Sequence, residues 1–197
     1  GLSSTGDSTS YQFNVQPITD LTLPLVVGDT ATGTFGHAGQ RHLYEVTLAA
    51  PSRLVFDALA GVAGLRWSLT GPQGEVVSPR SFTASDSADL TANPLLLLPA
   101  GAYTLIIDPD GDLGGDYGFR LLDLDAATPL VLGTTVNGTL PTGRETLIYR
   151  IDAAGRERAL FDLLSESRYA AHWRLIDPWG QVRFGPSNMA DVLTTLR

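Results

Sequence analysis

Apolar and polar residues alternate along several short stretches of this chain. Residues 43–48 (LYEVTL) alternate with a period of two, and residues 147–152 repeat the pattern later in the chain. Such alternation predicts half-buried β-strands. Other β-rich stretches bounded by Gly, Pro or Asp are residues 53–59, 66–70, 102–107, 117–122, 158–164 and 173–176. No stretch has the pattern of a capped helix, so the sequence predicts an antiparallel β-sandwich.

The chain repeats itself at a nearly constant offset. Residues 23–26 (LPLV) match residues 128–131 (TPLV), so Pro24 and Pro129 are 105 positions apart. Further matched pairs are Gly28 and Gly133, Gly33 and Gly138, Tyr44 and Tyr149, Phe56 and Phe161, and, at an offset of 106, Trp67 and Trp173. Chance would not keep so many Gly, Tyr and Trp residues in register. The sequence therefore predicts copies of one domain.

The offsets divide the chain into three parts. Residues 1–20 are expected to be the tail strand of a preceding repeat, because residues 11–13 (YQF) match residues 117–119 (YGF). Residues 21–125 are the first complete β-sandwich repeat. Residues 126–197 are the second repeat, C-terminally incomplete, with no expected counterpart of residues 95–123. The predicted fold class is all-β, with tandem antiparallel, jelly-roll-like sandwich domains.

The composition narrows the possible partners. The net charge is −8 and no basic stripe is present, so nucleic acid is not an expected partner. The most apolar stretch, residues 95–107, is interrupted by Pro99 and Gly101 and is too short to span a bilayer, so no membrane insertion is expected. The absence of cysteine excludes disulfides, thiolate zinc sites and thiol catalysis.

Five motifs of the first copy follow one another in an order typical of a known domain family. They are residues 33–35 (GTF), 44–46 (YEV), 67–74 (WSLTGPQG), 98–105 (LPAGAYTL) and 115–119 (GDYGF). With these motifs each copy resembles the bacterial pre-peptidase C-terminal domain. The resemblance implies a jelly-roll-like sandwich that serves as an accessory module of secreted proteases and large surface proteins. Family members often carry Asp two residues before the strand Tyr, where this chain has His42 and Leu147.

One loop of the first copy is rich in aspartate. Its carboxylates are Asp108, Asp110, Asp112 and Asp116. Alternating carboxylates can converge on one hard cation, so calcium is the candidate ion. Phe119 stands at the twelfth position from Asp108, where an EF-hand would place its bidentate Glu. The alternative is a plain hairpin loop, because Asp and Gly also favour turns.

Two aromatic residues of the second copy are candidates for ligand binding. Trp179 replaces Gln73 in a turn that should be exposed, and Tyr169 is added nearby. Exposed turn aromatics can stack on a polysaccharide or bind a protein ligand. The alternative is that they pack on a neighbouring copy.

No motif predicts catalysis, and the chain is expected not to be an enzyme. His37, His42 and His172 have neither repeat partners nor a metal-ligand spacing. Arg53 and Asp57 recur in the second copy and share one strand face, which favours a structural ion pair between them.

Two functional classes fit these observations. The first is a non-catalytic repeat module of a large bacterial secreted or cell-surface protein, acting as a structural spacer, an adhesion domain or a ligand-binding domain. The second is a substrate-binding accessory domain of a secreted protease or other hydrolase. The first is favoured because at least three copies are implied, which suits an extended array whose partners are its own neighbouring repeats.

Overall fold

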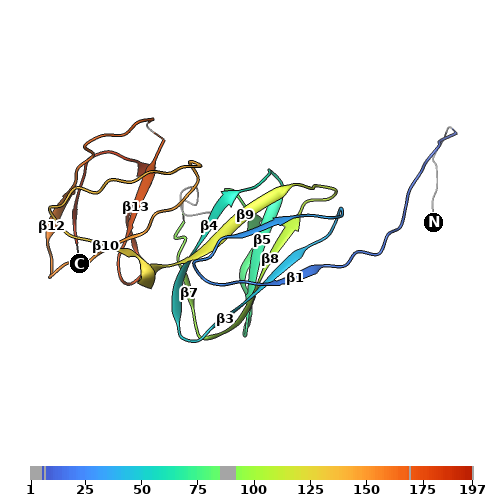
Figure 1. The fold of residues 1–197 in the computed structure, drawn as a ribbon, viewed down its shortest axis with the longest axis horizontal. Coiled ribbons are helices and arrows are strands. Elements are labelled where there is room, and N and C mark those ends of the chain that lie inside the picture. Colours follow the sequence, from blue (N-terminus) through green and yellow to red (C-terminus); the bar gives the residue numbers. More distant parts are fainter. Residues whose placement is uncertain (1–5, 7, 85–91, 169, 197) are drawn as a thin grey trace.

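The computed structural model describes residues 6, 8–84, 92–168 and 170–196, and its regular structure is nearly all β (Figure 1). Residues 21–125 form two facing sheets, called here the N-terminal sandwich. The first sheet contains, in spatial order, β1 (Leu21–Pro24), β3 (His42–Leu48), β8 (Gly101–Pro109), β5 (Leu65–Gly71) and β6 (Gly74–Ser81). The second contains β2 (Ala31–Thr34), β9 (Asp116–Asp123), β4 (Ser52–Ala60) and β7 (Leu96–Leu98). The predicted all-β sandwich is confirmed.

Period-two alternation places the core side chains between the two sheets. Along β3, Tyr44 and Val46 are buried, while Glu45 and Thr47 face solvent. Tyr44, Phe56, Trp67 and Leu69 have counterparts at matching offsets in the second copy, and each is at most 2% exposed. The core is thus built from the residues that recur along the sequence.

β8 and β9 are interior strands of the two sheets. β8 lies between β3 and β5, and β9 lies between β2 and β4, all in antiparallel pairing. Their large buried side chains are Tyr103, Leu105 and Ile107 on β8, and Tyr117, Phe119 and Leu121 on β9. β1 and β3 pair in parallel, which differs from the purely antiparallel sandwich expected.

Residues 128–196, called here the C-terminal part, form three two-stranded sheets. The pairs are β10 (Thr128–Leu130) with β11 (Tyr149–Ile151), β12 (Arg158–Phe161) with β15 (Val192–Thr195), and β13 (His172–Ile176) with β14 (Val182–Asn188). A short 3-10 turn, η1 (Leu124–Ala126), joins this part to the sandwich.

The parallel pair of the C-terminal part has the register of the parallel pair in the sandwich. Pro24 of β1 lies opposite Glu45 of β3, and Pro129 of β10 lies opposite Arg150 of β11. Both members of the second pair are displaced by 105 positions from the first, which is the offset of the sequence match.

A second pair also follows the sandwich. Arg53 of β4 lies opposite Leu97 of β7, and Arg158 of β12 lies opposite Thr195 of β15. The place of β15 beside β12 therefore resembles that of β7 beside β4. This differs from the expectation that nothing corresponds to residues 95–123. The correspondence between β15 and β7 is visible in the strand pairing and not in a sequence match. Within the described residues of the C-terminal part, no strand takes the interior places of β8 and β9.

The described residues before β1 are extended and lie outside both sheets. They run away from the sandwich on the side opposite the C-terminal part (Figure 1). Tyr11, Phe13 and Val15 are 67–80% exposed. The structure also contains, in its described ranges, no helix long and apolar enough to cross a membrane.

Candidate functional site

Two of the four aspartates of the candidate calcium loop, Asp110 and Asp116, bind different partners. Asp108 lies in β8, where burial raises the pKa of its carboxyl group. Asp110 forms an ion pair with Arg66, with 3.0 Å between Nε and Oδ1. Asp116, at the start of β9, accepts a hydrogen bond of 2.6 Å from the Thr34 hydroxyl group. Across the part of the chain that the structure describes, no group of three or more His, Cys, Asp or Glu side chains could hold a metal ion.

Calcium binding by Asp108, Asp110, Asp112 and Asp116 therefore stays a prediction from the sequence. It requires Asp110 to exchange Arg66 for the ion. Bound calcium would raise the melting temperature at millimolar concentration by mass action, and Asp110→Ala would abolish the rise. Differential scanning fluorimetry with and without calcium measures this shift. An unchanged melting temperature in the unmodified chain contradicts the prediction.

Trp179 lies on a well-defined turn and is exposed. Its side chain is 69% exposed in the turn between β13 and β14. The Asp177 carboxylate accepts hydrogen bonds from the backbone N–H groups of Trp179 (3.0 Å) and Gln181 (2.9 Å), which fixes the turn. The Asn93 side chain donates to the Gly180 carbonyl oxygen, so the turn is also tied to the N-terminal sandwich. Tyr169, the second candidate, lies outside the described residues.

The sequence did not reveal the partner of Asp57, the most deeply buried charge among the described residues. Asp57 of β4 is fully buried, and Arg120 lies directly opposite it on β9. Arg120 Nε donates to Asp57 Oδ2 across 2.6 Å. The backbone N–H of Thr146 donates to Asp57 Oδ1 across 3.1 Å, and Arg120 Nη2 donates to the Thr146 carbonyl oxygen across 3.1 Å. These three residues, called here the junction clamp, bind the C-terminal part to the sandwich.

The junction clamp replaces the ion pair expected within β4. Arg53 pairs with Asp125 and does not pair with Asp57. Arg53 and Asp57 are four residues apart on one strand, which is much farther than the distance between residues directly opposite on paired strands, so Asp57 pairs with Arg120 on β9. Burial raises the pKa of the Asp57 carboxyl group, and the hydrogen bonds from Arg120 and Thr146 oppose that rise.

A second polar cluster is buried where β3, β9 and β2 meet. The Tyr117 hydroxyl group forms hydrogen bonds with His42 Nδ1 and with the Tyr44 hydroxyl group, the latter across 2.8 Å. Gly33 makes room for it, because a Cβ atom there would lie 2.5 Å from the Tyr117 hydroxyl oxygen. Burial lowers the pKa of His42 and raises the pKa of Tyr117, so both side chains are neutral near pH 7. The recurrence of Tyr44 and Gly33 was the sequence signal for this cluster.

The unfolding free energy should fall as the pH drops below about 6.5 because of His42. The pKa of His42 is lower in the folded chain than in the unfolded chain, so the unfolded chain binds the proton more tightly. As the pH falls from the unfolded-state pKa toward the folded-state pKa, protonation therefore favours unfolding. Urea denaturation at several pH values between 5 and 7.5 measures the slope. His42→Gln should flatten it, whereas His37→Gln, at an exposed position, should leave it intact. An equal slope in all three proteins contradicts the prediction.

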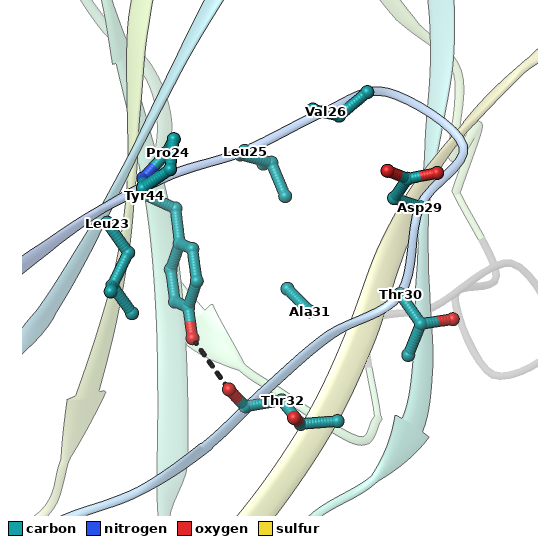
Figure 2. Close-up of a pocket in the computed structure, with 9 residues that line it drawn as sticks. All are labelled: Leu23, Pro24, Leu25, Val26, Asp29, Thr30, Ala31, Thr32 and Tyr44. Carbon is teal, nitrogen blue, oxygen red and sulfur yellow. Dashed lines mark hydrogen bonds between the residues drawn. The ribbon is translucent and has the colours of Figure 1, made fainter.

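A shallow cavity of about 330 Å³ opens at the sandwich edge beside this cluster. Figure 2 shows the Tyr44 ring as one wall, with its hydroxyl group directed at the Thr32 carbonyl oxygen 3.4 Å away. The other walls are mainly apolar, and Asp29 is the charged residue among them. A second hollow of about 500 Å³ in the C-terminal part is lined by Leu132, Gly133 and residues 157–160. Neither brings together several polar groups that would orient a small ligand.

Comparisons with known proteins do not identify a family for this chain. No family model matches it, and no curated protein matches it. Two similar solved structures are PliG, a periplasmic lysozyme inhibitor of g-type lysozyme, from Salmonella Typhimurium and from Aeromonas hydrophila. The Salmonella protein has 15% sequence identity and a TM-score of 0.38, and the match covers 51% of this chain and 98% of that protein. The Aeromonas protein has 12% sequence identity and a TM-score of 0.36, and the match covers 53% of this chain and 99% of that protein. A third is the pre-peptidase C-terminal domain of collagenase from Bacillus anthracis, with 16% identity, a TM-score of 0.31, and 55% and 99% coverage. Likeness at this level assigns no family and no activity.

Proposed function

We propose that this chain is a non-catalytic module of tandem β-sandwich repeats that acts as a structural spacer in a bacterial secreted or cell-surface protein. The observation that carries the proposal is the junction clamp. A fully buried carboxylate and its arginine hold the backbone of the following part by two hydrogen bonds of 3.1 Å each. A spacer needs such a fixed junction, because a flexible one would not set the distance between flanking domains.

Three pairings support the repeat relation in this proposal. The β10–β11 register equals that of β1–β3 displaced by 105 positions, and β12–β15 follows β4–β7. β13 and β14 form an antiparallel pair, as β5 and β6 do. Each pair is joined by a four-residue turn with Pro at its second position and Gly at its fourth. Two parts built on one plan, each contacting the next along the chain, are typical of a linear array.

The placement of the polar residues agrees with a structural role. Asp57 and Arg120 are engaged in the junction clamp, and His42 and Tyr117 bind each other in the core. Asp57, Arg120 and Tyr117 each have a partner that explains their burial, since an unpaired buried charge or hydroxyl group would cost several kcal/mol. His42 is paired through Nδ1 only, and its buried Nε2 atom has no hydrogen-bond partner.

Limited trypsin digestion tests the junction directly. Arg144 is exposed two residues before Thr146, so its peptide bond is held close to the junction clamp. Arg120→Met should accelerate cleavage after Arg144 without accelerating cleavage after Arg41, which pairs with Asp20 and takes no part in the junction clamp. Equal rates after Arg144 in the two proteins would show that the junction clamp does not restrain this segment, and the spacer proposal would lose its support.

A ligand-binding accessory role is the second candidate, favoured by Trp179. An aromatic side chain that is 69% exposed on a turn fixed by Asp177 offers a preformed stacking surface for a sugar ring or a peptide. We expect Trp179→Ala to abolish the retardation of the chain in polysaccharide-containing native gels while leaving the unfolding transition unchanged. Absence of retardation for the unmodified chain across the common bacterial and plant polysaccharides would leave this candidate without a sugar ligand.

A further inference from the structure

The segment before β1 has the side chains of an interior strand but no strand partner. Tyr11, Phe13 and Val15 stand 106 positions before Tyr117, Phe119 and Leu121, the buried residues of β9. In the sandwich these β9 side chains are at most 2% exposed, whereas their N-terminal matches are 67–80% exposed. Residues 11, 13 and 15 share one face of an extended chain, so the segment presents a continuous apolar stripe.

The C-terminal part offers the complementary place. β12 pairs with β15 on one side and, within the described residues, has no strand on the other, where β4 has β9. The side chains that would face the added strand are exposed: Leu147 by 47% and Tyr149 by 38%. Such an unpaired edge beside an apolar surface is a template for β-augmentation.

Gly138 completes the match. In the sandwich, Gly33 leaves the space that the Tyr117 hydroxyl group fills, and Gly138 is its counterpart. A Cβ atom at Gly138 would lie 3.3 Å from a Leu147 methyl group and 3.5 Å from the Tyr149 hydroxyl oxygen. The position beside Gly138 thus lies next to Tyr149, the counterpart of the Tyr44 residue that binds Tyr117.

We propose that residues 11–15 of one chain add as a strand to the free edge of β12 in a second copy of this chain. The register of β4 with β9 sets the pairing: Phe56 opposite Leu121 becomes Phe161 opposite Val15, and Gly33 opposite Tyr117 becomes Gly138 opposite Tyr11. The inference rests on the repeat relation of the proposed function. The added strand would take the place that β9 has in the sandwich, and the place of β8 would stay unfilled.

The geometry makes the contact a head-to-tail one. The donor segment and the C-terminal part lie at opposite ends of the molecule, so one chain cannot satisfy its own edge (Figure 1). Donor and acceptor are different surfaces, which is a heterologous interface, and successive chains would extend into linear oligomers.

Size-exclusion chromatography with light scattering tests the proposal on the full chain. The mean mass should rise above the 20.9 kDa of one chain as the protein concentration increases. Phe13→Ser removes the central donor side chain, and Gly138→Val fills the place of the Tyr11 ring. Each variant alone should remain at the mass of one chain. Val26→Ser, which removes an exposed apolar side chain away from both surfaces, should assemble as the unmodified chain does.

Mixing the two variants separates strand donation from other association. The Phe13→Ser chain keeps an intact acceptor and the Gly138→Val chain keeps an intact donor, so the mixture should form a complex of two chains and no larger species. A single-chain mass for the unmodified protein at every concentration overturns the proposal. So do oligomers that persist in either variant alone, or a mixture that stays at the mass of one chain. These outcomes do not depend on the junction clamp, which is probed within one chain by digestion after Arg144.

Discussion

Trp67→Ala should lower the unfolding free energy of the sandwich by about 3–5 kcal/mol, the range for truncation of a fully buried large aromatic residue. The Trp67 side chain is 0% exposed and stacks on Phe56, with 4.1 Å between ring centroids and 10° between ring planes. The guanidinium carbon of Arg80 lies 4.5 Å from the ring centroid on the β6 side. Truncation would leave a cavity between the two sheets and would remove the cation–π contact.

Urea denaturation followed by circular dichroism measures this cost. Trp179→Ala is the matched control, because it removes the same side chain from a position that is 69% exposed, and we expect a change within about 0.5 kcal/mol. A cost below about 1 kcal/mol for Trp67→Ala would show that this side chain does not form the centre of the core.

Arg120→Met should cost about 3–5 kcal/mol, because it leaves the buried Asp57 carboxylate without its cation. Asp57 is fully buried, and the guanidinium group is its charged partner at 2.6 Å. The substitution also removes the hydrogen bond to the Thr146 carbonyl oxygen, so the C-terminal part should loosen along with the sandwich.

A double variant distinguishes the loss of the pair from the loss of the arginine side chain. Asp57→Asn combined with Arg120→Met removes both charges and should recover much of the stability, since the penalty comes from the uncompensated carboxylate. Arg41→Met breaks the exposed pair with Asp20 and should cost less than about 1 kcal/mol. Equal costs for Arg120→Met and Arg41→Met, measured by urea denaturation, would contradict the assignment of Asp57 and Arg120 as a buried pair.

The sequence predicted those parts of the fold that local alternation determines. β3 and β5 were recognisable because every second residue of each is apolar, and these residues are buried in the structure. Gly33 and Tyr44 stood out in the sequence because both recur in the second copy, and the structure brings them together around the Tyr117 hydroxyl group. The parallel pairing of β1 with β3 was not predictable, because four residues of β1 carry no information about which strand lies beside them.

The site residues depended on contacts that are distant in sequence. Arg120 is 63 positions from Asp57, and only the register of β4 with β9 brings the two together. The aspartate loop looked like one cluster because its carboxylates are close in sequence. In the structure Asp108 belongs to β8, Asp110 lies just beyond the end of that strand and pairs with Arg66, and Asp116 begins β9 and binds Thr34.

A pulsed electron spin resonance measurement tests whether the junction clamp holds the sandwich and the C-terminal part at a fixed distance. The chain has no cysteine, so Thr47→Cys and Ser165→Cys allow one spin label on an exposed position of each part. Dilution with unlabelled chain removes distances between molecules. We predict a single narrow distance distribution that broadens in the Arg120→Met variant. A broad distribution in the chain with an intact junction clamp, unchanged by Arg120→Met, would contradict the account.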